Sequence, residues 1–137
     1  MTKAIITTTD NGMQIAGIDM SSFAGALKVT SALNVAASLD KTIEDGQAFE
    51  FVGCIFKDGK NDQTGDPCKE SYFILRDGSA LFTKSGGIYD SAQTILGLLG
   101  EWLESGLWAR VISIPTGRGN TLKALEPIAP PTDADAK

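Results

Sequence analysis

The order of the segments between Gln47 and Glu126 constrains the fold of this chain more than any other feature. The pattern predicts one long strand, a two-strand hairpin, an amphipathic helix and two further strands. In the first segment, Ala48 to Lys57, apolar residues alternate with other residues, and Gly53 interrupts the middle as the bend of a barrel strand would. The length of this segment is typical of a strand that two sheets share.

A polar stretch follows that carries Asp58-Gly59 and Asp66-Pro67 and predicts a long surface loop. Ser71 to Arg76 and Ser79 to Lys84 then flank Asp77-Gly78, a dipeptide typical of two-residue type I′ turns. These two runs predict a hairpin.

The hydrophobic period changes to 3.6 at Asp90, which predicts a helix of about four turns. Asp90 or Ser91 is the expected N-cap and Gly106 the expected C-cap. Trp102 lies on the apolar stripe, so we expect it to pack in the core. After the helix, the pattern predicts two strands over 108–114 and 121–126, joined by a loop over 115–120 that is neither helix nor ladder.

These elements predict a mainly β protein, a five-stranded OB-fold-like Greek-key barrel with a helix between strands 3 and 4. We expect a single domain over 1–128, in which 46–128 form the barrel, and a disordered tail over 129–137. The first 45 residues are an N-terminal elaboration with a hairpin of 3–8 and 13–18 and a short helix over 31–39. This part either caps the barrel or forms a contact in a homo-oligomer.

Composition excludes several classes of function. The chain has no histidine and no nucleotide-binding or hydrolase motif, so we expect no enzyme, no catalytic residue, no cofactor and no metal site. Asp58, Asp62 and Asp66 recur every four residues, but in a segment with turn formers we interpret them as solvated loop residues. We expect Cys54 and Cys68 to be reduced thiols, because no secretion signal precedes them. Without a membrane-spanning segment, we expect a soluble protein in the cytoplasm.

The net charge of −5 is unevenly distributed. From Lys57 to Lys123 there are eight basic and eight acidic residues, so the whole deficit lies outside this part of the chain. A local positive groove is compatible with that distribution.

The predicted turn also assigns the faces of the hairpin. With Asp77 and Gly78 as the turn residues, Tyr72 pairs with Thr83 and Phe73 with Phe82. One face then points into the barrel, and the other exposes a mixed set of residues: Tyr72, Ile74, Arg76, Ser79, Leu81 and Thr83. Rings beside cations are what single-stranded nucleic acid requires, because bases stack on the rings and phosphates pair with the cations.

The residues also resemble a known family. Ala32-Leu33-Asn34, the segment from Tyr72 to Gly78, Thr83 to Gly87 and Gly119 to Lys123 resemble small single-stranded-DNA-binding proteins encoded by bacteriophages. The resemblance covers roughly two thirds of the chain. It implies an OB-fold protein that coats single strands during phage DNA replication, in the host cytoplasm, without a cofactor and with little sequence preference. It also raises replication proteins as partners, although the tail ends in Lys137 without the terminal aromatic residue of bacterial relatives.

The sequence therefore predicts a non-enzymatic, sequence-tolerant binder of single-stranded DNA. The expected contact residues are two rings for stacking and six cations for phosphates: Tyr72, Trp108, Arg76, Arg110, Lys57, Lys60, Arg118 and Lys123. Several alternatives stay open: Tyr72 as a cover for a barrel edge, Arg76 as a solvated charge, Trp108 as core, and Tyr89 as either a stacking ring or a staple at the helix start. The alternative function is a protein-interaction module whose exposed Ile74 and Leu81 meet another protein.

Overall fold

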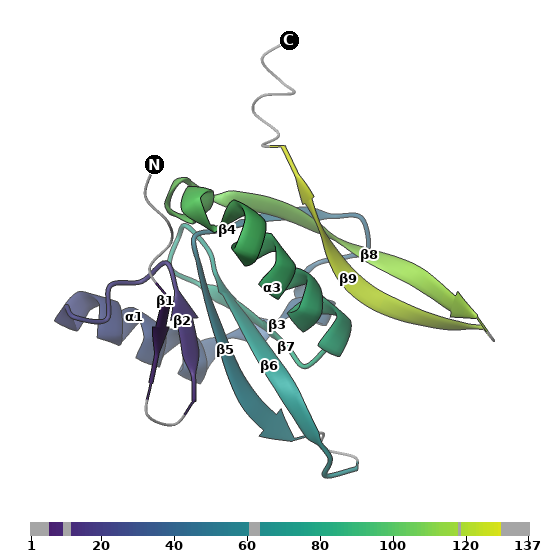
Figure 1. Ribbon diagram of the computed structural model, residues 1–137, viewed down its shortest axis with the longest axis horizontal. Helices are drawn as coiled ribbons and strands as arrows, with labels where there is room; N and C mark the ends of the chain where they lie inside the picture. Colours follow the sequence, from purple (N-terminus) through teal and green to yellow (C-terminus); the bar gives the residue numbers. More distant parts are fainter. Residues whose placement is uncertain (1–5, 10–11, 61–63, 118, 130–137) are drawn as a thin grey trace.

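The computed structural model describes residues 6–9, 12–60, 64–117 and 119–129, which form two β-sheets and three α-helices (Figure 1). Sheet A has the strand order β1-β2-β5-β6-β7-β3, and sheet B has the order β4-β8-β9. The strands are β1 Ile6–Thr8, β2 Gln14–Ala16, β3 Ala37–Ser38, β4 Ala48–Phe51, β5 Gly53–Lys60, β6 Pro67–Ile74, β7 Ala80–Thr83, β8 Leu107–Gly117 and β9 Asn120–Ile128. The helices are α1 Phe23–Val35, α2 Leu39–Thr42, α3 Gly86–Leu99 and the 3₁₀ helix η1 Gly100–Ser105.

One bent segment connects the two sheets. The predicted long strand is observed as β4 and β5, which are separated at Val52 and belong to sheet B and sheet A respectively. β4 pairs with β8, and β5 pairs with β6. Among the described residues β7 and β9 do not pair, because β3 lies along the outer edge of β7. The fold is therefore β-rich with two sheets, and the described strands form no closed barrel.

Sheet A is buried on both faces. On one face, Phe56, Phe73 and Leu81 pack with α3 and with sheet B in the larger core. On the opposite face, which we call the α1 face, Ile55, Ile74 and Ala80 pack with helix α1 through Val29 and Ala32. Figure 1 shows α1 behind sheet A and α3 in front of it.

The register of the β6–β7 hairpin differs from the prediction by one residue. Tyr72 pairs with Phe82 and Phe73 with Leu81. The predicted two-residue turn is wrong, because the Leu75 N–H donates to the Ser79 carbonyl and three residues form the loop. The Asp77 carboxylate accepts hydrogen bonds from the Ser79 N–H and hydroxyl, which holds this wider turn. A slip of one residue moves Phe82 and Leu81 to the opposite faces from those expected.

Helix α3 begins and ends earlier than predicted. Ser85 is the N-cap, since its hydroxyl accepts the Ile88 N–H, and Gly86 and Gly87 form the first turn. The Ser91 hydroxyl instead accepts the Leu125 N–H from the edge of β9. From Gly100 the chain tightens into η1.

The expectation that Trp102 packs in the core is wrong. Three residues per turn in η1 rotate Leu103 into the core and leave Trp102 40% exposed.

Both segments predicted as loops contain strands. β5 continues to Lys60 and β6 begins at Pro67, because Lys57 pairs with Glu70 and Asp58 with Lys69 across the two strands. β8 likewise continues to Gly117, and β9 begins at Asn120. A bulge lies between Pro115 and Gly117. The expected last strands are confirmed and are longer than predicted.

The N-terminal segment extends sheet A. The predicted hairpin is confirmed as β1 and β2, and β2 pairs with β5. The predicted helix over 31–39 is observed over Phe23–Val35 instead, because the Ser22 hydroxyl accepts the Gly25 N–H and caps it there. The predicted tail over 129–137 lies outside the described residues except for Ala129.

The contact between α3 and β9 gives a stability prediction. A Cβ atom at Gly87 would lie 2.1 Å from the Lys123 carbonyl oxygen, whereas one at Gly86 would meet nothing within 4 Å. We expect Gly87→Ala to lower the free energy of unfolding by about 1–3 kcal/mol through overpacking against backbone, measured by urea denaturation. Gly86→Ala is the matched control, and its effect should be stabilising or neutral, within about 1 kcal/mol. Equal effects of the two substitutions would contradict the close packing of α3 on β9.

Candidate nucleic-acid interface

The α1 face of sheet A continues beyond the helix as a row of charged residues. Ile55, Tyr72 and Phe82 form the last apolar row, since Ile55 pairs with Tyr72 and Tyr72 with Phe82. Two residues further along each strand, on the same face, lie Lys57, Glu70 and Lys84. We call these three residues the charged row. It lies on the part of the β5–β6–β7 face that α1 does not cover.

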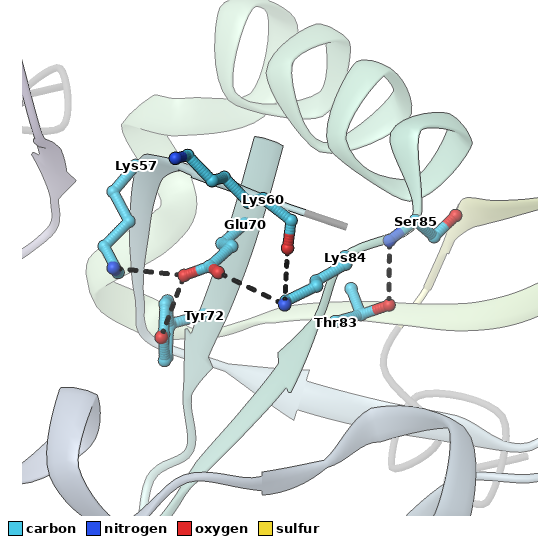
Figure 2. Close-up of polar contacts among 7 residues, drawn as sticks. All are labelled: Lys57, Lys60, Glu70, Tyr72, Thr83, Lys84 and Ser85. Atoms are coloured by element: carbon cyan, nitrogen blue, oxygen red, sulfur yellow. Dashed lines mark hydrogen bonds and ion pairs between the residues drawn. The ribbon is translucent and has the colours of Figure 1, made fainter. Parts of the chain in front are cut away.

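Glu70 is the centre of the charged row (Figure 2). Its carboxylate lies 3.1 Å from the Lys57 Nζ atom and 3.8 Å from the Lys84 Nζ atom. The Tyr72 hydroxyl donates to the same carboxylate at 3.3 Å. Lys84 also donates to the Lys60 carbonyl at 2.8 Å, which brings the end of β5 to this cluster. The two ammonium groups of Lys57 and Lys84 and the one carboxylate leave a local excess of one positive charge, because Lys60 contributes its carbonyl and not its side chain.

Tyr72 lies beneath this row. The residue is 7% exposed. The centroid of its ring lies 5.1 Å from the ring centroid of Phe82, which is half-buried. Burial, followed by the charge of Glu70, raises the pKa of the Tyr72 hydroxyl to about 12. The expectation that the Tyr72 face is open to solvent is wrong, because α1 packs on that face through Val29 and Ala32. In this structure the tyrosine presents its hydroxyl, and Phe82 is the more accessible ring.

Arg76 and Lys123 lie apart from the charged row, in ion pairs that each connect a turn to a strand. The Arg76 guanidinium donates to the Glu50 carboxylate at 2.7 and 3.1 Å and to the Ser105 carbonyl at 2.7 Å. These bonds hold the pKa of Glu50 below its usual value. Lys123 pairs with Asp45, which also accepts a hydrogen bond from Ser113. Both cations therefore have partners within the fold.

Two of the predicted DNA-contact residues, Trp108 and Arg110, lie together on the outer face of sheet B. They alternate along β8 with the buried residues Leu107, Ala109 and Val111. Trp108 is half-buried, and Arg110 is exposed and pairs with Glu126 on β9. Arg118 lies outside the described residues.

The opposite face of the β5–β6 hairpin carries another ring and cation. Tyr89 packs edge-on against Phe56 at 5.5 Å, and the Lys69 Nζ atom lies 5.9 Å from the Tyr89 ring centroid. Tyr89 thus fastens the start of α3 to the hairpin, which is one of the two roles expected for it.

Of the predicted contact residues, Lys57 and Tyr72 lie together in the structure, and Lys60 reaches them only with its carbonyl. The sequence pattern does not predict that Glu70 and Lys84 join them. Both follow from the alternation along β6 and β7 once the turn is assigned three residues. Within the described part of the chain, no group of three or more histidine, cysteine, aspartate or glutamate residues is placed to hold a metal ion. Among the same residues, no helix is long and apolar enough to cross a membrane.

Burial separates the two thiols. Cys54 is buried, which raises the pKa of its thiol, whereas Cys68 is half-buried, and both are free.

No protein-family model, curated protein or solved structure matches this chain at a significant level.

The packing of Tyr72 predicts how its substitutions behave. Because the ring is buried, Tyr72→Ala should lower the free energy of unfolding by about 3–5 kcal/mol. Tyr72→Phe removes only the hydroxyl that reaches Glu70 and should cost about 1 kcal/mol. Thermal or urea denaturation of both variants separates the contribution of the ring to the core from that of the hydroxyl to Glu70. Near wild-type stability of Tyr72→Ala would mean that the ring is not part of the core.

Proposed function

We propose that this protein binds single-stranded DNA with little sequence preference and coats it during phage DNA replication. The observation that carries the proposal is the charged row, where the ammonium groups of Lys57 and Lys84 converge beside the Tyr72–Phe82 ring pair. Cations next to an accessible ring are the combination that single strands require, and of this pair Phe82 is the half-buried and more accessible ring. A strand bound here would contact the protein through phosphates first, because the side chains of Lys57 and Lys84 are more exposed than the Tyr72 ring.

The order of strand pairing supports the same proposal. The bent segment β4–β5 pairs with β6 and with β8, β6 pairs with β7, and β8 pairs with β9. These are the pairings of OB-fold strands 1 to 5 apart from the one that closes the barrel, so we propose an OB-fold derivative in one domain over 1–128. In that fold, oligonucleotides cross strands 2 and 3, which correspond here to β6 and β7. The charged row lies on this part of the molecule.

Trp108 and Arg110 offer a second contact for a longer strand. They lie on sheet B with a ring and a guanidinium one strand repeat apart, so a base and a phosphate could engage them together. For Arg76, Arg110 and Lys123 alike, binding a phosphate would compete with an ion pair, to Glu50, Glu126 and Asp45 respectively.

The resemblance to phage single-stranded-DNA-binding proteins supports the biological setting of the proposal. A coating protein needs neither a cofactor nor a catalytic group, and it acts inside the host cell with replication proteins as neighbours. The net charge of −5 adds a physical expectation. Affinity should fall with salt, with a slope set by the few phosphates that the local lysines neutralise, and the repulsion between the rest of the chain and the phosphates should keep the affinity modest.

A second candidate function is protein interaction, and exposed apolar residues on α1 favour it. Phe23 is 83% exposed and Leu27 is 56% exposed, one helical turn apart. Ile74 and Leu81, which the sequence predicts to form such a surface, are 2% and 3% exposed, so that expectation is wrong. The register and the cover by α1 explain their burial. An apolar contact would differ from DNA binding by its weak dependence on salt.

The DNA proposal is tested by titrating a labelled oligo-dT of about 30 nucleotides at low and moderate salt, followed by fluorescence anisotropy. We expect salt-sensitive binding to the single strand and little binding to a duplex of equal length. Lys57→Gln combined with Lys84→Gln should weaken binding about tenfold at low salt, and the salt slope should fall by about 0.7 for each phosphate that the variant no longer neutralises.

A single variant and a melting measurement serve as controls for the double variant. Lys28→Gln makes the same chemical change on α1, where Lys28 lies beside Gly17 and Asp19 near the start of β5 and not near Lys57, and should leave affinity within about twofold of the wild type. Thermal melting checks that the double variant is folded. An equal effect of Lys28→Gln would mean that the lysine effect is one of net charge, and no binding by the wild type at low salt would overturn the proposal.

A further inference from the structure

We propose that the Glu70 carboxylate occupies the place of a DNA phosphate in the free protein and competes with DNA for it. This inference rests on the proposed function and concerns the control of affinity at the same site. It assigns a single phosphate position to the two ammonium groups of Lys57 and Lys84 and to the Tyr72 hydroxyl.

The donors around Glu70 are those that an oxyanion of a phosphate requires. One carboxylate oxygen, Oε1, faces both the Lys57 Nζ atom at 3.1 Å and the Tyr72 hydroxyl at 3.3 Å. The other oxygen, Oε2, lies 3.8 Å from the Lys84 Nζ atom. Two cations and one neutral donor converge on one anion from three neighbouring strands (Figure 2). Two oxygens of a tetrahedral phosphate would accept hydrogen bonds from the same donors.

The position of the carboxylate depends on a glycine. A Cβ atom at Gly59 would lie 2.2 Å from Oε2 of Glu70 and 2.5 Å from its Cδ atom. Glu70 therefore lies directly over the backbone of β5, in space that only glycine leaves open. The residue as a whole is 8% exposed, although it is charged and lies near the end of a hairpin. An acidic residue so enclosed by cations holds them in the geometry that an incoming anion would use.

Competition has a physical consequence for binding. A phosphate can enter only when the carboxylate rotates away, so DNA binding exchanges one anion for another. The exchange lowers affinity relative to a site without the carboxylate and favours release of the strand. A neutral residue at position 70 should therefore bind DNA more tightly.

Two variants remove the competitor in different ways. Glu70→Gln keeps the shape and an acceptor for the Tyr72 hydroxyl but removes the charge. Gly59→Ala keeps the net charge and displaces the carboxylate, and the backbone of Gly59 is not in the left-handed region, so alanine can adopt it. Glu101→Gln, on η1 at the far end of the molecule from the β5–β6 hairpin, controls for net charge (Figure 1).

The measurement is the anisotropy titration with oligo-dT at low salt, with thermal melting of every variant. We expect Glu70→Gln to bind about three- to tenfold more tightly than the wild type, the size of one close charge interaction at the dielectric constant of water. Gly59→Ala should also tighten binding, and Glu101→Gln should change it less than about twofold. Tightening by both site variants but not by the control supports the inference.

The opposite outcomes are distinguishable. If the wild type binds and both folded site variants bind equally or more weakly, Glu70 only positions the lysines and the inference is overturned while the proposed function stands. If Glu101→Gln tightens binding as much as Glu70→Gln, the effect is one of net charge and the inference is also overturned. If the wild type does not bind single-stranded DNA, the proposed function falls and the inference falls with it.

Discussion

The three-residue turn between β6 and β7 determines which side chains lie on which face of sheet A. Hydrogen bonds from Leu75 to Ser79 and from Ser79 to Asp77 set its length. With that register, Phe73 and Leu81 enter the core beneath α3, while Tyr72 and Phe82 lie on the α1 face. Both cores and the charged row depend on it, because a shift of one residue would exchange the faces of a whole strand.

A few individual residues and one short break in the chain join the two sheets, although the segments that they connect are far apart in the sequence. The break at Val52 lets one segment pair with β8 on one side and with β6 on the other. Gly87 and Ser91 then bring α3 against the edge of β9, one by the absence of a side chain and one through its hydroxyl. Arg76 ties the β6–β7 turn to β4 and η1 through Glu50 and Ser105. Ionic contacts thus hold the framework at positions where the sequence pattern predicts DNA contacts.

The pattern of the sequence predicts much of the framework and less of the site. The order of elements from Ala48 to Glu126 follows from alternation, from the helical period after Asp90 and from the glycines at turns. The helix start is hard to assign because Gly86-Gly87 is typical of a linker, and only packing against β9 shows why the helix needs Gly87. The site is harder to predict, because Asp77-Gly78 is compatible with two turn lengths and the cover by α1 is a long-range contact. Glu70 and Lys84 become neighbours only once the register is known.

If the proposed function holds, single-stranded DNA binds on the uncovered part of the β5–β6–β7 face. Amide chemical shifts of ¹⁵N-labelled protein, followed during titration with oligo-dT, report the contact surface residue by residue. We expect the largest changes at Lys57, Glu70 and Lys84 and in the strand ends around them, with little change along α1. Changes confined to Trp108–Ile112 on sheet B, or no change at low salt, would contradict this location of the interface.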